Sequence, residues 1–144
     1  MSSSTIEHDY ERTEYSRDLQ ISTEGHENIQ ILKDIPGSPF ADADMKEVYV
    51  MAAAYGYRND HIAPEDATGS REFVQRKALS DEQVSVMEAI AIAHEGTPMV
   101  LKDEQLVGSL VQRYALGGIE ALIDHCKTAD KPRDELLSEV KAAR

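Results

Sequence analysis

Apolar side chains recur at intervals of three and four residues along most of this chain, and this spacing constrains its fold more than any other feature. The pattern is clearest over residues 44–60, 80–96 and 103–126. Residues three or four apart share one face of an α-helix, so each stretch predicts a helix with a buried face. The alternation of apolar and polar residues that is typical of strands is absent. The sequence therefore predicts an all-α protein, a small bundle of four to six helices.

The clearest helix ends lie around the stretch 80–96. Ser80 precedes its first apolar residue and Gln83 follows three positions later, which is the spacing of a capping box. Gly96 followed by Pro98 predicts where this helix ends. A shorter amphipathic helix is expected over residues 26–35, immediately before Pro36 and Gly37.

The stretch 44–60 predicts a helix that begins after Asp44, with Glu47 as a capping-box partner. Gly56 is its predicted stop. The side chains expected on its buried face are Val48, Met51, Ala52 and Tyr55. Phe40, in the preceding loop, is expected to anchor that loop in the core.

Further along, a pair of glycines interrupts the apolar pattern. Gly117 and Gly118 predict a break between a helix from about residue 103 and a following helix that contains Ile119, Leu122 and Cys126. A last helix is expected from about Pro132, a residue that suits the first helical position.

The chain divides into two parts by composition. Residues 1–25 are polar and acidic, and they predict a flexible acidic arm or a marginal helix. Residues 26–144 predict a single helical domain. Within it, residues 59–79 form a connection longer than most loops. Such a connection is functional, mobile, or carries a short strand or turn around Phe73 and Val74.

An excess of acidic residues gives the chain a net charge of −12, from 27 Asp and Glu against 15 Lys and Arg. A strongly negative surface disfavours generic binding to the DNA backbone. Residues 31–79 are nearly balanced, with eight acidic and six basic residues, so a local contact with DNA remains open. Two explanations of the acidity stand side by side. One is an acidic coat suited to a salty cytoplasm, as in a halophilic archaeon, and the other is an acidic face that docks on a basic partner.

Targeting and redox signals point to the cytoplasm. No apolar run approaches the roughly 20 residues of a membrane span, and residues 1–15 lack the apolar region of a signal peptide. Cys126 is the single cysteine, which excludes an internal disulfide and any metal site built from cysteines. It lies in an apolar stripe and is expected to be a buried, inert thiol.

Catalytic patterns are weak. The five histidines are dispersed, and no glycine-rich phosphate loop follows a strand. His94 and Glu95 fall at a helix end, where a histidine cation suits the helix dipole. We therefore expect a protein that is not an enzyme, with no catalytic residue, cofactor or metal.

A small set of basic and aromatic residues offers the best candidates for contact with a nucleic acid or a partner protein. Arginine and lysine bind phosphate or carboxylate, and tyrosine is enriched at interfaces. The competing interpretation is that the cations pair with carboxylates of the same chain and that the tyrosines pack in the core. The candidates are Tyr57, Arg58, Arg71, Arg76 and Lys77.

Three stretches in order carry a family resemblance, spanning roughly residues 28–125. The first has Phe40, then MKEV at 45–48 and AAAYGYR at 52–58. The second has SDE at 80–82, AIAIA at 89–93 and Gly96, then VL at 100–101 and DE at 103–104. The third has YA at 114–115, GGI at 117–119 and Leu122. Together they resemble the fourth numbered family of proteins associated with DNA phosphorothioation systems.

The resemblance implies a role beside enzymes that place sulfur in the DNA backbone and enzymes that restrict unmodified DNA. It implies a non-enzymatic accessory or regulatory protein of this antiviral defence, acting through contacts with other proteins of the system. The alternative is a regulator that binds DNA directly through residues 58–77. A homo-oligomer stays open, and the resemblance is compatible with an archaeal host.

Overall fold

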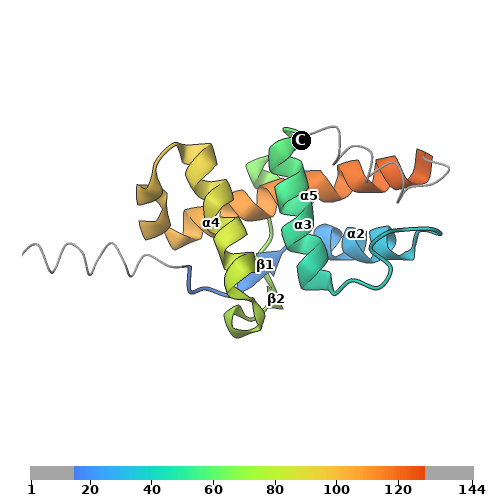
Figure 1. Cartoon of the computed structure of the whole chain (residues 1–144), viewed down its shortest axis with the longest axis horizontal. Coiled ribbons are helices and arrows are strands. Elements are labelled where there is room, and N and C mark those ends of the chain that lie inside the picture. The colour runs from blue at the N-terminus through green and yellow to red at the C-terminus, as the bar shows by residue number, and fades with distance from the viewer. Residues whose placement is uncertain (1–14, 129–144) are drawn as a thin grey trace, which may run out of the picture.

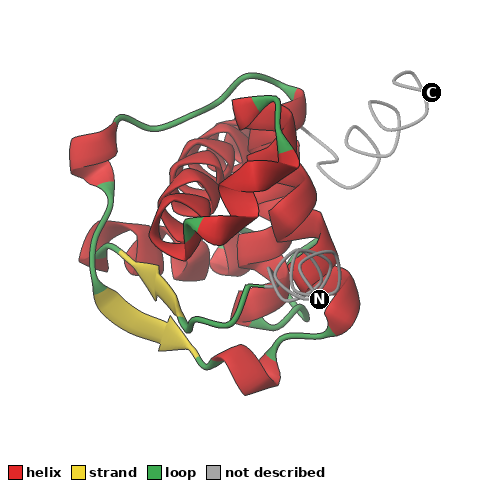
Figure 2. Ribbon diagram, turned by 90° about the vertical axis from the view of Figure 1, so that its left-hand side faces the viewer, coloured by secondary structure: helices red, strands yellow, loops and turns green. Residues whose placement is uncertain are grey.

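Four α-helices form the body of the part that the structure describes, with two short strands at one edge (Figures 1 and 2). The computed structural model describes residues 15–128. The helices are α2 (Thr23–Asp34), α3 (Met45–Arg58), α4 (Asp81–Glu95) and α5 (Glu104–Thr128), and the strands are β1 (Leu19–Ile21) and β2 (Arg71–Val74). Three 3-10 turns complete the order: η1 (Glu65–Ala67), η2 (Arg76–Ala78) and η3 (Pro98–Lys102). The prediction of a mainly helical fold is confirmed.

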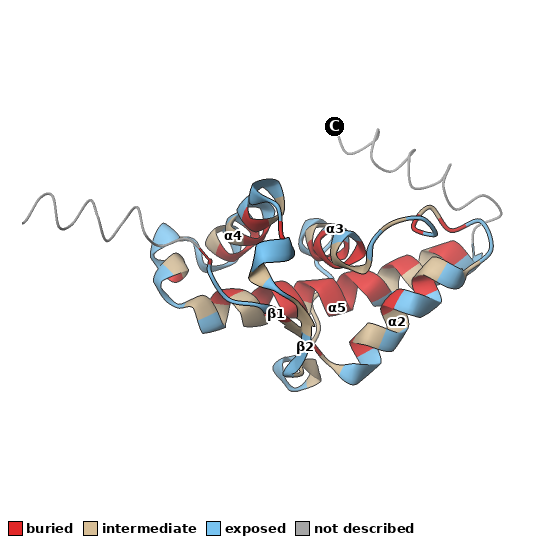
Figure 3. Cartoon of the chain, turned by 90° about the horizontal axis from the view of Figure 1, so that it is seen from below, coloured by how far each residue is buried: buried red, intermediate tan, exposed pale blue. Residues whose placement is uncertain are grey.

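The long helix α5 is the centre of the domain. α3 and α4 lie side by side across one side of it, and α2 packs against the other side (Figure 3). The most extensive helix contact joins α3 and α5. The largest fully buried side chains come from every layer: Leu19, Ile21, Ile29, Leu32, Val48, Tyr49, Val84, Met87, Val107, Val111 and Ile119. Phe40 is also buried, as predicted.

The predicted capping box of α4 is confirmed. Gln83 donates its backbone N–H to Ser80 Oγ at 3.1 Å, and Ser80 donates its backbone N–H to Gln83 Oε1 at 2.9 Å. The helix ends at Gly96, whose φ of 78° lies in the left-handed region that glycine adopts without strain. Local chemistry alone therefore fixes both ends of this helix.

Helix α3 differs from its prediction in three details. Asp44 precedes the helix, but its side chain makes no capping hydrogen bond. The helix continues past Gly56 to Arg58. Met51 is 53% exposed, so its predicted place on the buried face was wrong. The residues that α3 buries are Val48, Tyr49, Val50, Ala52, Ala53 and Gly56, a face rotated away from Met51.

The predicted break at Gly117 and Gly118 was also wrong, because α5 runs through both residues. A Cβ atom on Gly118 would overlap the backbone carbonyl oxygen of Ala52 in α3. A Cβ atom on Gly56 would likewise overlap the backbone carbonyl oxygen of Tyr114 in α5. The glycines therefore allow two helices to approach backbone to backbone, and this contact offsets their low helix propensity.

Strands β1 and β2 form an antiparallel pair against the helices (Figure 2). Leu19 pairs with Val74 and Ile21 with Arg71, with an irregularity between Leu19 and Gln20. A short strand around Phe73 and Val74 was one of the predicted alternatives and is confirmed. Its partner β1 was not predicted, because three residues are too few to show an alternating pattern.

The described part of the predicted acidic arm belongs to the packed domain. Tyr15, Leu19 and Ile21 are at most 3% exposed. The backbone N–H of Tyr15 donates to Glu88 Oε2 at 2.9 Å, which ties this segment to α4. Over residues 15–25 the structure thus differs from a flexible arm. Residues 1–14 of that arm, and the helix predicted from Pro132, lie outside the described residues.

Candidate functional site

The five candidate contact residues fall into two separate groups. Tyr57 and Arg58 end α3, whereas Arg71 lies on β2, and Arg76 and Lys77 lie on η2. The start of α3 adjoins η2, because Lys46 Nζ donates to the carbonyl oxygen of Ala78 at 2.9 Å. A helix of 14 residues is about 20 Å long, so the length of α3 separates the two groups. Tyr57 and Arg58 therefore do not share one continuous surface with Arg76 and Lys77.

Within the second group, Arg76 is engaged by the N-terminal segment. Its Nε donates to the carbonyl oxygen of Tyr15 at 2.7 Å, and its backbone N–H donates to Asp18 Oδ1 at 2.7 Å. Arg71 and Lys77 are exposed. Arg76 is therefore held within the chain, by a carbonyl oxygen at its guanidinium and a carboxylate at its backbone N–H, while Arg71 and Lys77 face solvent.

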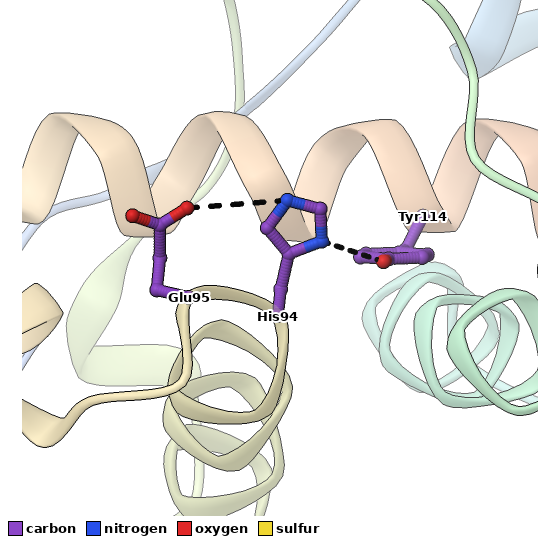
Figure 4. Close-up of polar contacts among 3 residues, drawn as sticks. All are labelled: His94, Glu95 and Tyr114. Atoms are coloured by element: carbon purple, nitrogen blue, oxygen red, sulfur yellow. Dashed lines mark hydrogen bonds and ion pairs between the residues drawn. The ribbon is translucent and has the colours of Figure 1, made fainter.

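In the first group, Tyr57 belongs to a cluster of rings between α3, α4 and α5. Its ring meets the Tyr114 ring edge to face, with centroids 5.5 Å apart. His94 Nδ1 lies 2.7 Å from Tyr114 Oη, and His94 Nε2 lies 4.0 Å from Glu95 Oε2 (Figure 4). His94 stands in the last turn of α4, as predicted.

Tyr114 is the member of this ring cluster whose pKa is shifted. Burial raises the pKa of Tyr114, and the neighbouring Tyr57 and Asp60 raise it further. The Tyr114 hydroxyl, which therefore keeps its proton, is in hydrogen-bond contact with His94 Nδ1. The contact between His94 and Tyr114 joins the end of α4 to α5.

Cys126 is 3% exposed, as predicted, and burial raises the pKa of its thiol. Because the thiolate is the reactive form, we expect iodoacetamide at pH 8 to alkylate native Cys126 at least about tenfold more slowly than the guanidinium-unfolded chain. Mass spectrometry of timed samples measures both rates. Equal rates would contradict the buried position of Cys126.

A preformed cavity lies where three segments meet: the start of α2, residues 60–67, and residues 116–121 of α5. Its volume is about 730 Å³. We call it the loop pocket. Sequence reasoning missed it, because its walls come from segments far apart in the chain. The one available signal was the unusual length of the connection 59–79.

Hydrogen bonds fix the connection against α5 and so set the wall of the loop pocket. The backbone N–H of Ala63 donates to the carbonyl oxygen of Arg113 at 2.9 Å, and Arg113 Nε donates to the carbonyl oxygen of Ala63 at 2.8 Å. Further along, Gln112 brackets the backbone of Gly69. Its Oε1 accepts from the Gly69 N–H at 2.7 Å, and its Nε2 donates to the Gly69 carbonyl oxygen at 3.1 Å.

Two glycines set the distances between the other walls. A Cβ atom on Gly117 would overlap the carbonyl oxygen of His61, so this glycine lets the connection lie directly on α5. A Cβ atom on Gly25 would overlap the side chain of Leu116, so α2 packs directly on that side chain of α5. The walls of the loop pocket are therefore held by a backbone contact at Gly117 and by the packing of Gly25 on the Leu116 side chain.

The lining combines buried apolar side chains, which we call the floor, with exposed carboxylates, which we call the rim. Leu116 and Ile119 of α5 are buried residues at the floor, and Ile62, Ala63 and Ala67 add apolar surface. The rim carries four exposed carboxylates: Glu24, Asp60, Asp66 and Glu120. None of the described residues that line the loop pocket is Lys or Arg.

The described part of the chain offers neither a metal site nor a helix suited to a membrane. Between residues 15 and 128, no three His, Cys, Asp or Glu side chains are grouped so that they could hold a metal ion. No helix within those residues combines the length and apolar character needed to cross a membrane.

Together these features define the class: an acidic, mainly helical protein whose described domain contains a preformed pocket with a negative rim. The family follows from comparison. The model of the family described as DNA sulphur modification system-associated protein 4 matches residues 19–144, and the chain belongs to this family. The match begins at β1 and includes the segment after Cys126, which lies beyond the stretches that carry the sequence resemblance. No curated protein and no solved structure matches the chain.

Proposed function

We propose that this protein is a non-enzymatic accessory or regulatory component of a DNA sulphur modification system and of the restriction-based defence that depends on it. It acts through contacts with other proteins of that system. The family match over residues 19–144 carries this proposal. The buried Cys126 thiol and the protonated Tyr114 hydroxyl support a role without covalent catalysis.

The charge distribution favours protein partners over DNA. The net charge of −12 repels the phosphates of DNA, whereas a basic surface on a partner protein attracts this acidic chain. The alternative function, direct DNA binding through residues 58–77, has weaker support. Arg76 already donates to Tyr15 and Asp18, and Arg58 lies at the far end of α3 from η2.

Co-purification tests the proposed function. The full chain with an affinity tag is expressed together with the sulphur modification and restriction proteins of its host, and recovered proteins are quantified by mass spectrometry. We expect at least one of these proteins to co-purify in a fixed ratio and to remain bound after nuclease treatment. Recovery of none of them, or loss of all of them with nuclease, overturns the proposal.

A matched variant separates the alternative. Arg71→Glu with Lys77→Glu reverses the two exposed charges near η2 and leaves the Arg76 contacts in place. Under the proposed function this variant co-purifies the same proteins as the unchanged chain. In a mobility-shift assay at low salt, neither protein should retard DNA. A shift that the variant abolishes would favour the direct DNA-binding alternative.

A further inference from the structure

We propose that the loop pocket receives one Arg or Lys side chain from a basic segment of the partner protein. This inference rests on the proposed function and names the chemistry of the contact. Its basis is the pairing of an apolar floor with a carboxylate rim in one preformed cavity.

The size of the loop pocket sets the scale of its occupant. About 730 Å³ falls within the roughly 300–1,000 Å³ of pockets that take drug-sized ligands, which leaves ample room for an arginine or lysine side chain. A metal ion is far smaller and needs converging ligands. No such group of His, Cys, Asp or Glu occurs within residues 15–128. The dimensions therefore suit a side chain with its adjoining backbone.

The lining selects the chemistry of that side chain. Arginine and lysine carry an apolar stem and a charged head, and they bury the stem while the head stays near polar groups. Leu116 and Ile119 offer a surface for the stem. The carboxylates of Asp66 and Glu120 belong to a rim that can face the head. An uncharged apolar side chain would gain nothing from this rim, and a phosphate would be repelled by it.

The partner protein is expected to carry the positive charge that the rim attracts. Proteins that handle DNA neutralise its phosphates with Lys and Arg, so a DNA sulphur modification system includes basic surfaces. A chain with a net charge of −12 is drawn toward such surfaces over several ångströms, and the fit of one side chain then sets the position.

The walls of the loop pocket are fixed by contacts within the chain. The paired hydrogen bonds between Ala63 and Arg113 and the close contact of Gly117 with His61 hold the walls in place. A rigid site loses little conformational entropy when it binds, which favours a contact as small as one side chain.

A second cavity, of about 680 Å³, shows why the loop pocket is the better candidate. It lies between the segment 15–20, residues 68–72 and the first half of α5. Arg17 lines it beside Asp18, Glu72 and Glu104, so this cavity already contains a cation of the chain. No Lys or Arg is among the described residues that line the loop pocket.

The first experiment uses a defined probe. The full chain, labelled with ¹⁵N, is titrated with acetyl-Gly-Arg-Gly-amide and followed by its amide resonances. We expect saturable shifts centred on residues 60–67 and 116–121. The same peptide with citrulline, which keeps the shape of arginine without its charge, should bind at least about tenfold more weakly. Absent binding, or equal binding of both peptides, overturns the inference.

Matched variants separate the loop pocket from general attraction. Asp66→Asn with Glu120→Gln removes two rim charges, and Asp42→Asn with Glu82→Gln removes two exposed charges outside the pocket. The rim variant should weaken binding of the arginine peptide about tenfold, and the control variant less than about twofold. Equal weakening would mean that net charge alone attracts the peptide, and the inference would fall.

A third variant changes shape without changing charge. Ala121→Leu places a larger side chain in the lining of the loop pocket. Provided that Ala121→Leu melts at the same temperature as the unchanged chain, we expect it to weaken binding of the arginine peptide as much as the rim variant does. Should it fold poorly, the rim and control variants decide the question alone.

The same rim and control variants enter the co-purification assay. If the system proteins bind the unchanged chain and the rim variant equally, the inference fails and the proposed function stands. If they bind the unchanged chain and the control but not the rim variant, both are supported. If the system proteins bind neither the unchanged chain nor either variant, the proposed function fails. The peptide titration then decides whether the loop pocket accepts arginine.

Discussion

Replacing Gly118 with alanine is expected to lower the free energy of unfolding by about 3 kcal/mol, although the change adds only one methyl group. The added Cβ would overlap the backbone carbonyl oxygen of Ala52, and a backbone atom cannot rotate away as a side chain can. Helices α3 and α5 would have to separate along the most extensive contact of the domain. Thermal unfolding followed by circular dichroism should shift down by roughly 10 °C.

The matched control lies on the same helix. A Cβ atom on Gly108 would come 3.1 Å from Tyr15 Oη, the end of a side chain that can move. Alanine also has a higher helix propensity than glycine by about 1 kcal/mol. Gly108→Ala should therefore melt within a few degrees of the unchanged chain. If Gly118→Ala also melts within a few degrees of the unchanged chain, the backbones of α3 and α5 are not in close contact at this position.

The glycines also show where prediction from sequence stops. Ser80, Gln83 and Gly96 were predicted correctly, because capping depends on residues within one turn of each other. The break predicted at Gly117 and Gly118 was wrong, because the purpose of these glycines depends on Ala52 and His61, which other segments bring to them. A glycine in a helical pattern can indicate either the end of a helix or a close approach by another segment. Only the position of that other segment in the folded chain distinguishes the two cases.

The candidate site shows the same division. Charge and aromatic content selected Tyr57, Arg58, Arg71, Arg76 and Lys77. The structure places Tyr57 and Arg58 at one end of α3, Arg76 and Lys77 near its other end, and Arg71 on β2. The loop pocket is built instead from acidic and apolar residues of three segments. None of these residues is unusual within its own segment, so no local pattern indicates the cavity. The long connection 59–79 pointed to the right region without identifying its chemistry.

Gln112→Leu is expected to cost about 2–3 kcal/mol, although leucine has nearly the size of glutamine. Gln112 is 4% exposed, and its amide makes two hydrogen bonds to the backbone of Gly69. Leucine makes neither bond, so the partly buried N–H and carbonyl of Gly69 would lose their partner. Urea unfolding should show the loss of stability as a lower midpoint with an unchanged slope.

Hydrogen exchange distinguishes the loss of these two bonds from a general loss of packing. The Gly69 amide hydrogen should exchange at least about tenfold faster in Gln112→Leu than the global loss of stability explains, because its acceptor is removed. The control is Gln105→Leu on the exposed face of the same helix, which should change stability by less than about 0.5 kcal/mol. The bonds of Ala63 to Arg113 remain in both variants, so residues 60–67 should stay protected. Faster exchange throughout residues 60–70 would instead mean that Gln112 holds the whole connection, the wall of the loop pocket included.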